Sequence, residues 1–219
     1  DTTLRGGNGN DTIWGGDGRD NVRGEAGNDV IYGGAGNDGL TVAGVTFYLK
    51  GDAGDDIIYG DAGEDYLRGD SGRDQLYGGD DNDDARGGSG DDLIYGDAGH
   101  DVLEGDDGDD ELHGGDGNDT IRGEEGEGLL YGDAGNDDIR GGTDDNVIYG
   151  GTGDDVIYGG LGDDVVDGGS GDDNLQANGG DDTYIVSTGH DYISDSGSGT
   201  NGDRLVFGDG VDMDDLAFS

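Results

Sequence analysis

Apolar residues recur along this chain at a fixed interval of nine, from Ile13 to Tyr184. All 20 of these positions are apolar, and most are Ile, Val or Leu. Each follows a glycine-rich hexad, as in the consecutive nonapeptides GGNGNDTIW, GGDGRDNVR and GEAGNDVIY that begin at Gly6. Because glycine costs about 1 kcal/mol per helical position, the hexads are predicted to form tight turns. The last three residues of each nonapeptide are predicted to form a short strand with its middle residue facing inward.

A second period, of 18 residues, appears at the ninth position of the nonapeptide, which is expected to face outward. Alternate repeats carry Tyr59, Tyr77, Tyr95, His113, Tyr131 and Tyr149 there, and the intervening repeats carry Lys50, Arg68, Arg86, Glu104, Arg122 and Arg140. Two repeats per coil, placed in opposite sheets, explain this segregation. The sequence therefore predicts an all-β fold: a right-handed parallel β-roll (a two-sheet β-helix) of about ten 18-residue coils. The frame is predicted to run without insertion, even at residues 42–50, where the glycines are lost.

The charge of the chain changes this picture. The sequence has 55 Gly, only 29% hydrophobic residues and a formal charge of −45, a composition typical of disorder. If the chain folds, cations must neutralise its acids, and nucleic acid or an anionic membrane is not expected as a partner. The absence of Cys excludes disulfides and thiolate metal sites, and no apolar run is long enough for a direct membrane span.

The sixth position of the nonapeptide supplies the candidate cation ligands. It is Asp in 17 of 20 repeats, and the exceptions are Phe47, Gly128 and Asn146. Carboxylate oxygens, together with carbonyl oxygens of a glycine turn, are the hard ligands that Ca2+ prefers. The predicted metal ligands are Asp11, Asp20, Asp29, Asp38, Asp56, Asp65, Asp74, Asp83, Asp92, Asp101, Asp110, Asp119, Asp137, Asp155, Asp164, Asp173 and Asp182.

Over residues 6–185 the repeat resembles the RTX (haemolysin-type) calcium-binding family, whose consensus is GGxGxDxUx. The resemblance implies calcium ions between stacked turns on each edge of the roll, each ion sharing ligands from two turns. Carried over to this chain, alternate sixth positions form two columns, one from Asp11 and one from Asp20. Seven neighbouring Asp pairs in the first column and six in the second give about 13 full sites. Phe47 should interrupt the first column, and Gly128 and Asn146 the second, although Asn146 still has an amide oxygen to offer.

The family resemblance also implies export by a type I secretion apparatus and an extracellular or cell-surface location. We expect a noncatalytic module that is disordered without Ca2+ and folds after export, when Ca2+ binds. Its three His residues show no catalytic or zinc spacing. The parent protein is expected to be a toxin or secreted enzyme that the sequence does not identify. The alternative is a structural adhesin or surface-layer segment that self-associates through the Tyr face; a third possibility is that the roll touches the polymeric substrate of an upstream enzyme.

The two ends depart from the repeat. Residues 1–5 are expected to be the tail of an upstream segment, and residues 6–182 the calcium-binding roll. Residues 183–219 are expected to be a C-terminal capping region, with strands at 183–186 and 204–207. Within it, residues 203–218 (DRLVFGDGVDMDDLAF) resemble the region that follows such arrays in the family. Repeat arrays need atypical terminal units to cover the last apolar layer.

Overall fold

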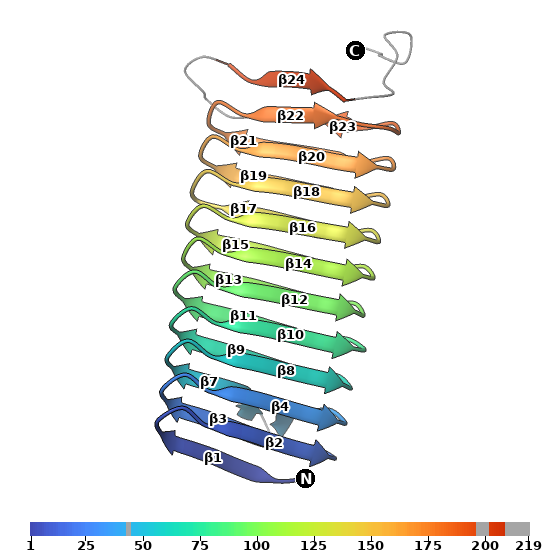
Figure 1. Cartoon of the computed structure of the whole chain (residues 1–219). Helices are drawn as coiled ribbons and strands as arrows, with labels where there is room; N and C mark the ends of the chain where they lie inside the picture. The colour runs from blue at the N-terminus through green and yellow to red at the C-terminus, as the bar shows by residue number, and fades with distance from the viewer. Residues whose placement is uncertain (43–44, 196–201, 209–219) are drawn as a thin grey trace.

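Two parallel sheets face each other along the molecule and are connected by turns into a coil (Figure 1). The computed structural model describes residues 1–42, 45–195 and 202–208. Sheet A contains, in spatial order, β1 (Thr3–Asn8), β3 (Asn21–Ala26), β7 (Leu49–Ala53), β9 (Tyr66–Ser71), β11 (Asp84–Ser89), β13 (Val102–Asp107), β15 (Thr120–Glu125), β17 (Asp138–Gly142), β19 (Val156–Leu161), β21 (Asn174–Gly179) and β23 (Tyr192–Ile193). The predicted all-β roll is confirmed, with eleven strands in each sheet.

Sheet B has the same construction on the opposite side. It contains β2 (Thr12–Asp17), β4 (Val30–Ala35), β8 (Ile57–Ala62), β10 (Gln75–Asp80), β12 (Leu93–Ala98), β14 (Glu111–Asp116), β16 (Leu129–Ala134), β18 (Val147–Thr152), β20 (Val165–Ser170), β22 (Thr183–Val186) and β24 (Arg204–Phe207). Within the described residues there is no helix that is long and apolar enough to cross a membrane.

Alternating burial along each strand places the apolar position inside. From Val22 to Leu175, the eighth-position residues of both sheets that the structure describes are fully buried. Most strands are six residues long rather than the predicted three, because pairing continues through the first glycines of the next hexad. Those first glycines also face inward, as the burial of Gly33 and Gly51 shows. The turn proper is therefore shorter than the sequence suggested.

A hairpin interrupts the repeat, so the prediction of an unbroken frame was wrong. Val22 of β3 pairs with Leu49 of β7, and Ile31 of β4 pairs with Ile58 of β8, each an offset of 27 residues where the rest of the roll uses 18. The extra nine residues include β5 (Leu40–Val42) and β6 (Val45–Phe47), which pair with each other antiparallel. This stretch lacks the glycine hexad that makes the turn, so the chain leaves the roll and returns one repeat later.

The outer face of sheet B carries one continuous aromatic stack. Because of the insertion, the ladder gains two members that the 18-residue count had left out, Trp14 and Tyr32. Ring centroids of successive members, from Trp14 through His113 to Tyr149, are 4.4 to 5.7 Å apart with nearly parallel planes. The ladder spans eight coils and is half-buried over most of its length, a geometry of cross-strand packing.

The last strands continue both sheets. β23 pairs with β21 at the regular offset of 18, and β24 pairs with β22 at an offset of 21. The predicted strands at 183–186 and 204–207 are confirmed. Leu205 and Phe207 of β24 are 48% and 44% exposed, so this end of the roll presents apolar side chains. The expected capping role of residues 183–219, and the boundary at residue 182, remain predictions.

Candidate metal sites at the turns

The 17 sixth-position Asp residues lie at the turns between the sheets and are buried. Sixteen of them are at most 3% exposed, and Asp11 in the first coils is partly exposed. One carboxylate oxygen, Oδ2, is buried without a hydrogen-bond partner in all 17. Burying an unpartnered carboxylate oxygen costs free energy, because its hydration is lost and nothing replaces it. Such a repeated feature indicates that each turn is built for a further, positively charged group.

The other oxygen, Oδ1, holds the turns in register. It accepts the backbone N–H of the sixth-position residue one coil earlier, as from Asp83 N to Asp101 Oδ1 at 2.7 Å. These bonds define two columns. The first is Asp11, Asp29, Asp56, Asp74, Asp92, Asp110, Gly128, Asn146, Asp164 and Asp182, and the second is Asp20, Asp38, Asp65, Asp83, Asp101, Asp119, Asp137, Asp155 and Asp173.

These columns correct the ones expected from the sequence. Phe47 lies in β6, outside the roll, and does not interrupt a column, because Asp29 N donates directly to Asp56 Oδ1 at 2.6 Å. After Asp38, the inserted hairpin moves each later sixth-position residue to the column opposite the one expected. Gly128 and Asn146 therefore lie in the column of Asp11. The columns hold six and eight neighbouring Asp pairs, in place of seven and six.

Glycine at the first position leaves room for two oxygen atoms to converge. A Cβ built on Gly96 would stand 2.5 Å from Asp101 Oδ2 and 2.5 Å from the carbonyl oxygen of Gly114 in the next coil. The same arrangement recurs at Gly69, whose Cβ would meet Asp74 Oδ2 and the carbonyl of Gly87. The unpartnered carboxylate oxygen therefore shares its surroundings with a backbone carbonyl. This donor set, all oxygen and partly charged, fits Ca2+.

The buried carboxylates are poorly suited to remain charged alone. Burial raises the pKa of Asp65, Asp83 and Asp92 to about 8, although a backbone N–H donated to each lowers it and neighbouring acids raise it. Burial likewise raises the pKa of Asp74 and Asp137 to about 7. A raised pKa means that the folded turn favours a neutralised carboxyl group. Either a proton or a bound cation can provide that neutralisation.

Two adjacent turns in the first column lack this arrangement. At Gly128 there is no side chain, and Asn146 follows it one coil later. Asn146 Oδ1 accepts the N–H of Gly128 at 2.9 Å, just as Asp Oδ1 does elsewhere, while Nδ2 donates to the carbonyl of Asp144 at 2.6 Å. Nδ2 lies beside Gly141, where other turns have Oδ2. A hydrogen-bond donor thus replaces the unpartnered oxygen, and the amide oxygen that the sequence suggested as a ligand is already used.

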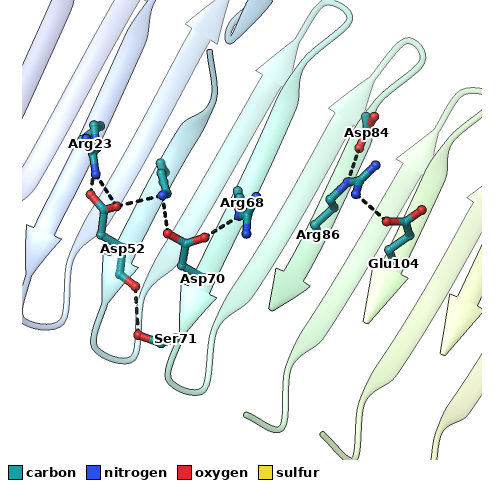
Figure 2. Close-up of polar contacts among 9 residues, drawn as sticks. Arg23, Asp52, Arg68, Asp70, Ser71, Asp84, Arg86 and Glu104 are labelled. Atoms are coloured by element: carbon teal, nitrogen blue, oxygen red, sulfur yellow. Dashed lines mark hydrogen bonds and ion pairs between the residues drawn. The ribbon is translucent and has the colours of Figure 1, made fainter. Parts of the chain in front are cut away.

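The basic residues at the ninth positions of sheet A pair with acids of the same and neighbouring strands. Figure 2 shows Arg23 paired with Asp52, and Arg86 bridging Asp84 and Glu104. The distance from Arg86 Nη1 to Glu104 Oε2 is 2.8 Å. Each of these Arg and Lys residues, from residue 5 to 140, has such a carboxylate partner. The sequence contains an indication of this pairing, because acids recur at the second and seventh positions of the nonapeptides that carry these bases.

Comparison with known proteins agrees with this geometry. The family model of the RTX calcium-binding nonapeptide repeat (four copies) matches residues 5–40, 48–76, 77–112, 95–130, 104–139, 131–166 and 158–193. The match breaks off between residues 40 and 48, where the hairpin leaves the roll. No curated protein was found to match the chain. With most of its length covered by this model, the chain belongs to the family of RTX calcium-binding nonapeptide repeat proteins.

Proposed function

We propose that this calcium-binding repeat module is disordered without Ca2+ and folds when Ca2+ enters its turns. The observation that supports this most is the buried, unpartnered Oδ2 of all 17 sixth-position Asp residues. Without a counter-ion, two columns of stacked carboxylates would oppose folding both by lost hydration and by mutual repulsion. Binding of the ion and ordering of the turn are then one event.

The proposed ligands of each ion are the carboxylates of two stacked Asp residues and glycine carbonyls of the same turns. The 17 Asp residues predicted from the sequence take this role, and each interior Asp serves the ion before it and the ion after it. Fourteen neighbouring Asp pairs would hold about fourteen ions, which would reduce the formal charge from −45 to about −17. Calcium supplies the charge, and the chain supplies the spacing through its Oδ1 hydrogen bonds.

We propose further that folding follows secretion, as part of a toxin or other secreted bacterial protein. Extracellular calcium modules bind with Kd values of about 10⁻⁴ to 10⁻³ M. Sites of that strength stay empty at cytosolic calcium concentrations, so the chain would pass a type I exporter unfolded and become ordered outside the cell. The candidate sites among the described residues are the cation-binding turns. A noncatalytic role fits these sites best.

A calcium titration tests the proposal. Far-UV circular dichroism of the 219-residue chain should change from disordered to β-rich as Ca2+ is added, and native mass spectrometry should count about fourteen bound ions. Magnesium at equal concentration should have a much smaller effect, because it is reluctant to lose its water. A β-rich spectrum in excess chelator at neutral pH would refute coupled folding, and a folded chain without bound calcium would refute the site assignment.

A second candidate function is structural assembly, as in an adhesin or surface layer. It is favoured by the aromatic ladder, a half-buried row on the outer face of sheet B that is flanked by acids. Tyr59 and Tyr77 line an open hollow of about 410 Å3 together with Asp61, Asp80 and Asp97. Sedimentation velocity in calcium distinguishes the two candidates: ordered polymers that disappear in Tyr77→Ala would support assembly, whereas a monomer supports a module that acts alone.

A further inference from the structure

The end of the first column is built differently from its other turns. Asp182 Oδ1 accepts the N–H of Asp164 at 2.8 Å, as in every regular turn. Asp182 N in turn donates to Asp203 Oδ1 at 3.1 Å, and Arg204 N donates to the carbonyl of Asp182. Asp203 therefore takes the sixth-position place in the next coil, although it lies 21 residues further along the chain rather than 18. The sequence repeat had concealed this residue.

The first position of this turn is Ala177, where the roll otherwise has glycine. One coil earlier in this column, a Cβ on Gly159 would stand only 2.4 Å from Asp164 Oδ2. Ala177 has that methyl group, so the carboxylate of Asp182 cannot occupy the usual position beside it. Ala177 is fully buried, and its N–H donates to the hydroxyl of Tyr184 at 2.7 Å. The methyl group of Ala177 therefore occupies space that the regular turns leave to the carboxylate.

A third carboxylate meets this group from the opposite sheet. Asp195 follows β23, and by the 18-residue offset between β21 and β23 it corresponds to Ala177. One oxygen atom each of Asp182, Asp195 and Asp203 lie within 4.8 Å of one another. Asp182 is 1% exposed and its Oδ2 has no hydrogen-bond partner, whereas Asp195 and Asp203 are exposed. Three carboxylates thus converge where regular turns offer two and a glycine carbonyl.

We propose that Asp182, Asp195 and Asp203 form a separate calcium site that closes the C-terminal end of the roll. The family match ends at residue 193, so Asp195 and Asp203 lie outside the repeat signature. Asp182 precedes β22, Asp195 follows β23 and Asp203 precedes β24, so one ion would join both sheets at this end. A third carboxylate raises the affinity for a divalent cation, since affinity depends on the number of charged ligands. This site is therefore the tightest on the chain.

The test compares Asp195→Asn with wild type in the 219-residue chain. Native mass spectrometry and calcium-indicator competition should show one ion fewer and loss of the tightest binding step, weakened about tenfold or more, while the β-rich spectrum in saturating calcium is kept. Asp107→Asn, which removes one exposed acid from β13, is the matched control and should bind the wild-type number of ions. Asp137→Asn should instead lose binding in the roll and keep the tightest step.

An unchanged ion count and an unchanged tightest step in Asp195→Asn would overturn the proposal. If that variant did not fold at moderate calcium, the count would be repeated at saturating calcium: recovery with one ion fewer supports the site. Recovery with the full count, or no recovery at any calcium concentration, overturns it. The inference rests on the proposed function for the choice of Ca2+ and shares one ligand with it, Asp182, which also pairs with Asp164 in the column. A wild-type chain that binds no calcium would refute both proposals. A wild-type chain that binds calcium, together with an Asp195→Asn variant that binds the same number of ions with the same tightest step, would refute this site alone.

Discussion

The turns at Asp83 and Asp101 and the turns at Gly128 and Asn146 join strands of five or six residues that pair at the same offset of 18. Asp101 Oδ1 and Asn146 Oδ1 accept the same backbone hydrogen bond, at 2.7 and 2.9 Å. They differ at the second atom: Asp101 has an unpartnered oxygen there, and Asn146 has an amide nitrogen that donates to Asp144. The comparison separates two tasks of the sixth position, because Oδ1 sets the spacing of the coils and Oδ2 is free for a cation.

The largest expected effect comes from pH in the absence of calcium. The folded-state pKa of Asp65, Asp83 and Asp92 is raised by burial from 3.8 to about 8. A raised folded-state pKa stabilises the roll fully below pH of about 4, and this stabilisation is lost as pH rises through about 8. In chelator, circular dichroism should therefore report more β structure at pH 5 than at pH 8. In calcium the order should reverse, because protons compete with the ion; equal spectra at both pH values in chelator would contradict the assignment.

A substitution in the middle of a column should affect two ions. Asp101→Asn keeps the Oδ1 acceptor but removes the carboxylate that both neighbouring pairs share, so two ions fewer are expected, with a higher calcium midpoint for folding. Asp101→Ala should be worse by about 1–3 kcal/mol, because the buried N–H of Asp83 then loses its acceptor. Ion counting and calcium-dependent unfolding measure the two effects. Equal behaviour of the Asn and Ala variants would show that Oδ1 has no separate structural task.

The reverse substitution in the exceptional turn should add a site. Asn146→Asp creates a carboxylate pair with Asp164, one coil later, and one additional ion is expected by native mass spectrometry. Gly128 still lacks a side chain, so a second additional ion is not expected. Asn136→Asp, at the exposed fifth position of a neighbouring turn, makes the same change in charge and should leave the count unaltered. A gain in both variants would point to nonspecific binding.

The smallest effect is expected from removing the hairpin. Deletion of residues 40–48 joins Gly39 to Leu49 and restores a regular nonapeptide, so the fold, the ion count and the calcium midpoint should change little. Deletion of residues 94–102, which form a regular nonapeptide, is the matched control. It would move every later strand to the other sheet and set Tyr side chains against Arg side chains. Circular dichroism at fixed calcium compares the two; a comparable loss in both would mean that the hairpin is required for the roll.

The architecture followed from the sequence because its period is visible at several independent positions. The inward apolar residue, the outward alternation and the sixth-position Asp all repeat with the same frame, and all agree with the sheets observed. The inserted hairpin was missed because nine residues equal one repeat, so counting positions cannot detect it. A different signal was present: Trp14 and Tyr32 are aromatic, yet Lys50, 18 residues after Tyr32, is basic. The change from aromatic to basic residues at this 18-residue spacing indicates that one extra repeat has been inserted.

The terminal site could not be found by periodicity. Asp203 is displaced by three residues from the frame, and Asp195 falls where the roll has glycine, so neither matches the sixth position. Their proximity depends on where β23 and β24 join the two sheets, which a repeat pattern does not specify. The individual acids that pair with the bases of sheet A, such as Asp52 and Asp84, could not be picked out for another reason. In a chain with 55 acids, single carboxylates carry little information until their strand neighbours are known.

The hydrogen bonds to the carboxylates along each column all run the same way. In every regular turn, the amide of the earlier coil donates to the carboxylate of the later coil, as from Asp137 to Asp155 at 2.9 Å. Backbone bonds between coils run in both directions, as from Val102 N to the carbonyl of Asp83 and from Gly90 N to the carbonyl of Asp107, so a coil at either boundary loses some of them. A coil at the C-terminal boundary has, in addition, a buried sixth-position N–H with no carboxylate acceptor. An orphaned buried N–H is a costly defect. Shortening the array from its beginning should therefore be tolerated better than shortening it from its end, which makes the roll a polar structure whose order depends on what comes later in the chain.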